Sequence, residues 1–453
     1  MSLISDAIKR SISRRTFLKG AGSLAAVPFL TGLGGSVLTG CSSSSTADTG
    51  PDNSGTKLVI LGSSGGVSYW PGSTRASSSS ALVVNGTIYL IDLGQGSTAR
   101  LNEAFDSKSV VNPNGTYIYP YSSVFLSQVK ALFFTHLHQD HVADYANLLL
   151  IGAGSNLGNY LANNDNPGWG LNPLQVIGPC NRGQLDINKS PYIKDTDLDA
   201  WVINAYSPVP PFVTPTPGTV QMTDMIWQAF AQAINDIMLD DGYPNYTSLV
   251  KVSEIGTQLP TQSGNTCLTT PPFQVYPVDK SKSADENGVS VWATLVDHRQ
   301  VYPAFAYRFN TPSGSVVFSG DTGPNTTADR NASTQAYPNG NLQVLANGAD
   351  VLVHEVIDSA WITAKFGDPK DPSPAYTLMT HMKNAHTQVE YVGQVAAYCN
   401  VKTLVLNHII PGMAPISHLQ QAQQNFPGNL IISEDLMQID VSRVGSRVIS
   451  KRG

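Results

Sequence analysis

The chain has 453 residues, of which 41% are hydrophobic and only 13% are charged. This composition excludes an intrinsically disordered chain, and the length is sufficient to bury a large core in one or two domains. Acidic residues outnumber basic ones by 33 to 27, and five of the basic residues lie in the first 40 positions. The remaining acidic chain lacks the positive surface that a nucleic-acid polymer requires, so no such partner is expected.

Residues 1–40 have the pattern of an export signal. Arg14 and Arg15 precede a weakly apolar run that is rich in glycine. Twin arginines before such a run are typical of a twin-arginine signal, which carries folded proteins across the bacterial inner membrane. The glycines and Pro28 make the same run a poor permanent transmembrane span.

The signal is followed by a candidate lipid-attachment site. The letters LTGC, at positions 38–41, resemble a lipobox, which predicts cleavage before Cys41 and a lipid on its thiol. The alternative is an ordinary exposed cysteine. Residues 41–56 are rich in Ser and Thr and would form a flexible tether. We therefore expect a chain anchored to the membrane through Cys41, on the periplasmic side.

After the tether, short apolar runs alternate with turn residues. The run at 81–94 predicts two strands joined by an Asn85-Gly86 hairpin turn. The periodicity at 142–152 is that of a helix. The other strands predicted in this half are 57–62, 129–135 and 174–179.

Residues 181–285 interrupt this rhythm. They are rich in Pro, Asn and Asp and contain one amphipathic helical pattern at 223–241, so they are expected to form an insertion or cap rather than scaffold.

Strand and helix patterns then alternate to the end of the chain. The predicted strands are 290–298, 303–309, 314–322, 349–356, 401–408 and 429–435, and the predicted helices are 387–399 and 415–425. Strands dominate early and strand–helix pairs come later, which predicts an α/β fold with two packed sheets and helices outside, an αββα sandwich. It would span 57–440, followed by a tail at 441–453.

The stretch THLHQDH follows the strand at 129–135 directly. It places His136, His138, Asp140 and His141 within six positions of a chain that has only nine histidines. Imidazole and carboxylate groups are the ligands of zinc and neighbouring transition metals. A strand that delivers such a loop to one point predicts a metal site, and the alternative is a chance cluster or a helix cap.

Three further residues of the same types close predicted strands. They are His298, Asp321 and His408. Each follows apolar or β-branched residues and precedes a turn, so we expect them to complete the metal site. A satisfied core histidine is the alternative for His298.

The motif THLHQDH resembles the signature of metallo-β-lactamase-fold hydrolases. Within that superfamily the chain is similar to the ribonuclease Z group, which includes related phosphodiesterases and arylsulfatases. The resemblance covers 57–180 and 288–440. It also rests on the segments ILGSSGG, STRASSSSALVV, LIDLGQGS, LQVIGP, FSGDT, VLVHEV and AHTQVEYVGQVAAYCNVKTLVLNH, which occur in the family's order.

The resemblance implies two Zn²⁺ ions, with Mn or Fe as alternatives, and a hydroxide that bridges them and attacks the substrate. The implied ligands are His136, His138 and His298 for the first metal, Asp140, His141 and His408 for the second, and Asp321 for both. Asp140 counts as a catalytic residue as well as a ligand. The net positive charge of such a site favours a small anionic ester.

Two short blocks resemble the part of the family's site that lies near the leaving group. They imply His386 as a general acid and Glu355 as the residue that orients it. The alternative is that Glu355 only fixes the orientation of a metal ligand. His354, His381 and His418 are interpreted as surface histidines or as residues that support the ligands.

These features predict an exported dinuclear zinc hydrolase that cleaves a phosphodiester or sulfate ester, either of a small nucleotide or of an aryl group. One alternative is a lactonase or lactamase of the same fold. The other is a non-catalytic lipoprotein with a structural metal. A homodimer stays open as an assembly state.

Among the cysteines, Cys399 lies in a helical pattern and is expected to be a core thiol. Cys180 and Cys267 could pair in an oxidising compartment, but their spacing does not decide it.

Overall fold

The structure is a computed structural model that describes residues 55–106, 111–117, 125–159, 172–181, 217–257, 270–299, 301–324, 340–370, 373–444 and 449–450. The expected export signal, Cys41 and most of the tether lie outside these residues, as does Cys267. No helix of the described part combines the length and the apolar character needed to cross a bilayer.

The described residues form two mixed β-sheets. The first has eight strands in the order β15-β14-β1-β2-β3-β4-β5-β6, and the second has seven in the order β13-β12-β11-β10-β9-β8-β7. The first sheet comprises β1 (Thr56–Gly62), β2 (Ser79–Val84), β3 (Thr87–Ile91), β4 (Val129–Phe133), β5 (Leu174–Pro179), β6 (Val250–Ile255), β14 (Gln438–Asp440) and β15 (Ile449–Ser450). The second comprises β7 (Phe273–Tyr276), β8 (Ser290–Leu295), β9 (Phe305–Thr311), β10 (Gly314–Phe318), β11 (Val351–Ile357), β12 (Thr403–Ile410) and β13 (Asn429–Ile432).

The alternation of side chains along β1 shows how the layers are built. Leu58 and Ile60 join the core between the two sheets, whereas Val59 and Leu61 join a second apolar cluster with the helices of the first sheet. Successive strand residues point to opposite faces, so a strand that is apolar throughout requires cover on both sides.

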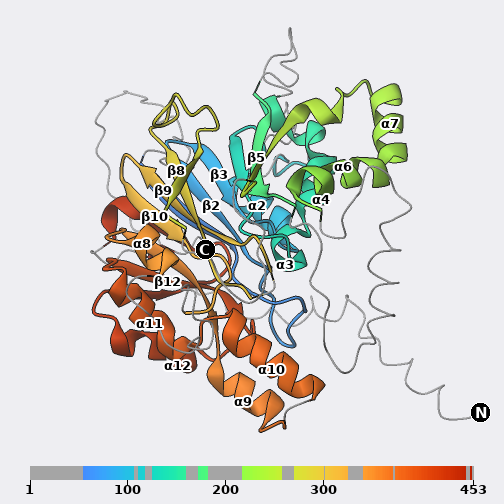
Figure 1. The fold of residues 1–453 in the computed structure, drawn as a ribbon. Coiled ribbons are helices and arrows are strands. Elements are labelled where there is room, and N and C mark those ends of the chain that lie inside the picture. The colour runs from blue at the N-terminus through green and yellow to red at the C-terminus, as the bar shows by residue number, and fades with distance from the viewer. Residues whose placement is uncertain are drawn as a thin grey trace, which may run out of the picture. The chain divides into compact units, whose positions relative to one another are not determined.

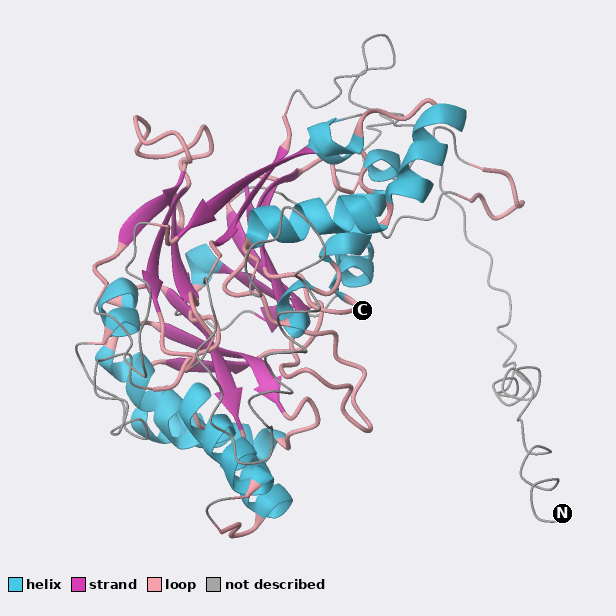
Figure 2. Cartoon of the chain, turned by 45° about the vertical axis from the view of Figure 1, so that its right-hand side comes forward, coloured by secondary structure: helices cyan, strands magenta, loops and turns pink. Residues whose placement is uncertain are grey.

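Helices supply that cover on the outer face of each sheet. Figures 1 and 2 show the strands between two groups of helices. Beside the first sheet lie α2 (Ser97–Phe105), α3 (Gln139–Val142), α4 (Tyr145–Ile151), α6 (Thr219–Ala229) and α7 (Ala231–Asp240). Beside the second lie α8 (Asn341–Ala346), α11 (Val389–Tyr398) and α12 (Ile416–Leu419), and α9 (Ser359–Phe366) packs with α10 (Pro374–Ala385). The predicted αββα sandwich is confirmed.

The predicted hairpin at 81–94 is confirmed as β2 and β3. Asn85 and Gly86 have φ values of 49° and 85°, the left-handed pair that a two-residue hairpin turn requires.

The segment 181–285 differs from its expected form. Within it, β6 and β7 are edge strands of the two sheets, so this segment contributes to the scaffold as well as to its cover. The expected helix at 223–241 is two helices, α6 and α7, separated at Phe230, where φ is −109° and ψ is 15°. The apolar residues keep a helical spacing across the break at Phe230. The sequence pattern therefore predicts one helix where the structure has two.

Candidate metal centre

The seven expected ligands meet because their strands end at one edge of the sandwich. In the second sheet β8, β10, β11 and β12 run in the same direction, so their carboxyl ends lie side by side. His298 follows β8, Asp321 follows β10 and His408 lies near the end of β12. The loop after β4, in the other sheet, brings His136 and His138 to the same place.

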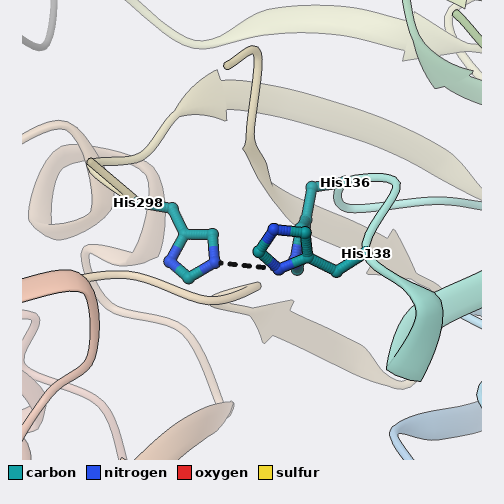
Figure 3. Close-up of side chains that lie close together, drawn as sticks. All are labelled: His136, His138 and His298. Atoms are coloured by element: carbon teal, nitrogen blue, oxygen red, sulfur yellow. Dashed lines mark hydrogen bonds between the residues drawn. The ribbon is translucent and has the colours of Figure 1, made fainter. Parts of the chain in front are cut away.

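Three imidazoles form the first ligand group. His136, His138 and His298 have ring nitrogens within 4.8 Å of one another. Figure 3 shows the three side chains close together, with a dashed line from His298 to His138. The distance from His298 Nε2 to His138 Nδ1 is 3.4 Å. Two nitrogens bound to a tetrahedral zinc at about 2.0–2.1 Å lie about 3.3–3.4 Å apart, so this spacing fits one shared cation.

The second ligand group contains Asp140, His141, Asp321 and His408. His408 Nε2 lies 3.2 Å from Asp140 Oδ2 and 3.2 Å from Asp321 Oδ1, and His141 Nε2 lies 3.3 Å from the same Asp321 oxygen.

Asp321 faces both groups with different oxygens. Its Oδ1 faces His141 and His408, whereas its Oδ2 lies 3.9 Å from His136 Nε2 and 3.7 Å from His298 Nε2. A carboxylate in this position can bridge two cations, one on each oxygen.

Several atoms of these groups are buried without a hydrogen-bond partner among the described residues. They are His136 Nε2, His141 Nε2, His408 Nδ1, Asp140 Oδ1 and Asp321 Oδ1. A buried polar atom with no partner costs free energy, and nearly all such atoms in folded proteins are satisfied. His136 Nε2 and His141 Nε2 face the Asp321 carboxylate at 3.9 and 3.3 Å, and imidazole nitrogen and carboxylate oxygen are ligands that zinc prefers, so the residues present fit divalent metal binding.

The ionisation of the site also suits metal binding. Burial lowers the pKa of His136 and His298 well below the usual value, so both imidazoles are neutral and have a lone pair available. Burial alone would raise the pKa of Asp321, but His408 and His141 outweigh it and hold the pKa well below its usual range. The first ligand group therefore offers neutral imidazoles. In the second group, burial alone would lower the pKa of His141, but nearby carboxylates, that of Asp321 foremost, outweigh it and raise the pKa well above its usual value, so a metal has to displace a proton there.

Asp92, which is not among the site residues expected from the sequence, fixes the orientation of His141. Its Oδ2 lies 2.8 Å from His141 Nδ1, and its two oxygens accept hydrogen bonds from the Thr135 backbone N–H and hydroxyl, each at 2.8 Å. A carboxylate on the second ring nitrogen fixes the tautomer of a metal-binding histidine. In the sequence it is the aspartate that begins DLGQG, within one of the segments on which the family resemblance rests.

His408 is held in an unusual backbone conformation. Its φ is 45°, and the pairing of β11 with β12 shifts register next to it. A non-glycine residue in the left-handed region is uncommon and clusters at functional sites. Beyond this irregularity β12 continues to Ile410, two residues past the predicted end.

Glu355 and His386 lie beside the metal ligands. Glu355 Oε1 accepts the backbone N–H of Thr387 at 2.7 Å, and its Oε2 lies 3.3 Å from His386 Nδ1. His386 Nδ1 is 3.9 Å from Asp321 Oδ2. Burial alone would lower the pKa of His386, but the Glu355 carboxylate outweighs it and raises the pKa to about 9.

The three remaining histidines differ from one another. His354 is fully buried, with Nδ1 2.7 Å from the Glu355 carbonyl, so a surface position is wrong for it. His381 is half-buried, with its ring 6.1 Å from both His298 and His386. His418 Nδ1 lies 2.9 Å from Asp358 Oδ2, away from the ligand groups.

Two of the four cysteines, Cys180 and Cys399, lie in the described residues. Cys399 is fully buried in the cluster beneath α11, which confirms it as a core thiol. Cys180 is half-buried, and because Cys267 lies outside the described residues their pairing stays a prediction.

The described residues form two sheets flanked by helices, with a His/Asp cluster at the carboxyl ends of the strands, as expected from the resemblance to metallo-β-lactamase-fold hydrolases. The sequence of the chain is similar to ribonuclease Z of Mycobacterium sp. strain KMS, with 24% identity over 388 residues that cover 85% of this chain and 96% of the relative. A putative ribonuclease Z of Mycobacterium tuberculosis strain CDC 1551 / Oshkosh is 26% identical over 251 residues, or 54% of this chain and 92% of the relative. The expected resemblance to the ribonuclease Z group is confirmed.

Two other comparisons concern the signal sequence and solved structures. The family of twin-arginine translocation pathway signal sequences matches residues 11–31, which confirms that expectation. Among solved structures, the short form of human tRNase Z aligns with a TM-score of 0.45 and 17% identity, covering 85% of this chain and 99% of that one. Zn²⁺-bound PqqB from Methylobacterium extorquens aligns with a TM-score of 0.44 and 14% identity over the same shares.

Proposed function

We propose that this protein is an exported, metal-dependent hydrolase of phosphodiester bonds that acts on a small anionic ester, either a nucleotide or an aryl ester. The observation that carries the proposal is the pair of ligand groups that share Asp321, each facing a different oxygen of its carboxylate. Relatives named ribonuclease Z support the bond type, because RNA is a phosphodiester polymer.

We propose Zn²⁺ as the metal, with Mn or Fe as alternatives, and two ions per chain. His136, His138 and His298 would hold one ion, Asp140, His141 and His408 the other, and Asp321 both. When bound, two divalent ions supply Lewis acidity and lower the pKa of water enough to provide a nucleophile near neutral pH.

The charge of the site favours an anionic substrate. The first ligand group contains neutral imidazoles, and the carboxylates of Asp140 and Asp321 are the acidic groups among the proposed ligands. Two carboxylates only partly neutralise two divalent cations, so a buried site of this kind attracts an anion and stabilises negative charge that develops during the reaction.

In this proposal His386 protonates the leaving group. Its raised pKa keeps it protonated at neutral pH, and Glu355 holds the ring through Nδ1. Nε2 is then the nitrogen left to donate a proton. A positioned acid of this kind contributes about 10²- to 10⁴-fold to the rate when the leaving group is basic.

The substrate is small in this proposal, and transfer RNA is not expected. Export removes the chain from the cytoplasm, and the acidic balance of the sequence disfavours a nucleic-acid polymer. The twin-arginine signal supports export, and a lipid on Cys41 would hold the enzyme on the periplasmic side of a membrane.

A hydrolysis screen tests the function directly. The compact unit that begins at Asp52, loaded with zinc, is given a bis-aryl phosphate, a cyclic nucleotide, an aryl sulfate, a lactone and a cephalosporin. The proposal predicts turnover of a phosphodiester above the others, abolished in Asp321→Ala. A preference for the lactone or cephalosporin, or no turnover of any ester, would reject it.

A further inference from the structure

The loop between β1 and β2 is attached to the metal centre at its first residues. The backbone N–H of Gly66 donates to Asp140 Oδ2 at 2.7 Å, on the carboxylate that faces His408. The Gln139 side chain donates to the Val67 carbonyl at 3.1 Å. The loop therefore starts at the ligands themselves, and its next residues lie at the edge of the site.

Trp70 braces the other side of this loop. Its indole Nε1–H donates to the Gly65 carbonyl at 2.8 Å, and its ring packs edge-on against Trp361 of α9 with 5.5 Å between the ring centroids. Trp70 and Trp361 belong to an apolar cluster that also contains Met379 and Met382 of α10. The loop is thus fixed between the metal centre and the α9–α10 pair, which agrees with its position in Figure 1.

Between these two anchors the chain presents apolar side chains to solvent. Tyr69 is 85% exposed, the highest value among the exposed large hydrophobic residues of the described part, and Val67 is 57% exposed. Tyr69 lies three residues from Gly66, which limits the separation of their Cα atoms to about 11 Å. Tyr69 and Val67 therefore put exposed apolar surface beside the polar groups of the metal centre, and ligand sites combine apolar surface with a few convergent polar groups.

We propose that Tyr69 binds the planar ring of the substrate, a nucleobase or an aryl group, by stacking while the phosphate occupies the metal centre. The inference rests on the proposed function and names the residue that selects its substrate. A ring and its phosphate are only a few bonds apart in a nucleotide or an aryl phosphate, which matches the short path from Gly66 to Tyr69. Because Trp70 already fixes the loop, binding of the ring costs little conformational entropy.

Calorimetry with paired phosphates tests this without depending on catalysis. The zinc-loaded protein is titrated with adenosine 5′-monophosphate and with ribose 5-phosphate, and separately with phenyl phosphate and with methyl phosphate. The wild type should bind the ring-bearing member of at least one pair more tightly, and the pair that shows the preference tells a nucleobase from an aryl group. Tyr69→Ala should weaken that ligand about 10-fold and leave its ring-free partner unchanged, whereas Tyr69→Phe should retain the preference.

Leu239→Ala is the matched control, because Leu239 is 82% exposed on α7 and the inference gives it no role. The same variants are assayed on bis(p-nitrophenyl) phosphate, where Tyr69→Ala should raise KM about 10-fold with kcat unchanged. The role of Tyr69 would be overturned if the wild type bound both members of each pair with equal affinity. It would also be overturned if Tyr69→Ala lowered the affinity for both members equally. An intact ring preference in a protein that hydrolyses no phosphodiester would reject the proposed function instead.

Discussion

Asp92 is the residue on which the orientation of His141 depends. We predict that Asp92→Asn weakens zinc binding at the second ligand group by about 10- to 100-fold, because an amide no longer stabilises the tautomer that directs His141 Nε2 at the metal. Competition with a fluorescent chelator measures the affinity.

The matched control is Asp358→Asn, which alters an Asp–His contact of similar length, 2.9 Å to His418, outside the ligand groups. Equal zinc affinities in Asp92→Asn and the wild type would contradict the role given to Asp92.

The loss of kcat on removing the His386 side chain should increase with the basicity of the leaving group. We predict that His386→Ala lowers kcat by about 10²-fold or more for a phosphodiester with an alkoxide leaving group and by far less for one with p-nitrophenolate, which departs without a proton. Steady-state rates on two such esters with the same retained group provide the comparison.

His418→Ala serves as the reference variant for that experiment, since this histidine contacts Asp358 and not the ligands. Losses of the same size on both esters would show that His386 does not act as the acid.

At the residue scale the sequence was informative where one motif carried the chemistry. The cluster at 136–141 and the strand-end residues His298, Asp321 and His408 could be chosen from residue type and position alone, and the structure brings them together. Asp92 could not be chosen in that way, because one aspartate after a strand is common and its partner His141 lies 49 positions away. The buried state of His354 was hidden for a similar reason, since it depends on the helices that pack over β11.

At the scale of elements, the loop after β1 is hydrogen-bonded to β12 through the Gly65 N–H and the Ile409 carbonyl, at 3.1 Å. A Cβ at Gly65 would lie 2.2 Å from His408 Nδ1, and Gly65 is not among the residues with positive φ. Gly65→Ala therefore meets a steric conflict and not backbone strain, and we predict that it displaces His408 and lowers the bound zinc from two ions to one. Metal analysis of the purified variant after dialysis gives the stoichiometry.

Gly154→Ala is the control for this substitution, because a Cβ there would lie 3.6 Å from the Tyr243 hydroxyl, an ordinary contact. A Gly65→Ala protein that still holds two ions would show that His408 does not depend on this close approach.

Helices and strands with a strong local sequence pattern could be predicted. Those whose formation depends on packing against neighbouring elements could not. The β2–β3 hairpin follows from Asn85-Gly86, and the strands of the second half follow from short apolar runs. In the edge strand β6 the Lys251 side chain is exposed and the others are only half-buried, and the sequence VKVSEI lacks the continuous apolar run of strands such as β1. Helices α9 and α10 lie between predicted blocks, and the sequence analysis assigned nothing to them.

At the scale of the whole molecule, the cellular location of the chain should depend on the thiol of Cys41. We predict that Cys41→Ser moves the mature chain from the membrane fraction to the soluble periplasmic fraction, because a serine at that position receives no lipid. Fractionation and immunoblotting of the full-length chain measure the distribution.

A double substitution, Arg14→Lys with Arg15→Lys, provides the comparison for export, since it alters the matched signal and should retain the chain in the cytoplasm. A Cys41→Ser chain that stays with the membrane would reject the lipid anchor while leaving export intact.

The central claim concerns two cations held between the sheets by residues from 136 to 408. Anomalous diffraction at the zinc absorption edge from crystals of the zinc-loaded protein tests it most directly. The account predicts two peaks, one beside each oxygen of Asp321, with the first contacting His136, His138 and His298 and the second contacting Asp140, His141 and His408. A single peak, or no peak within bonding distance of Asp321, would contradict it.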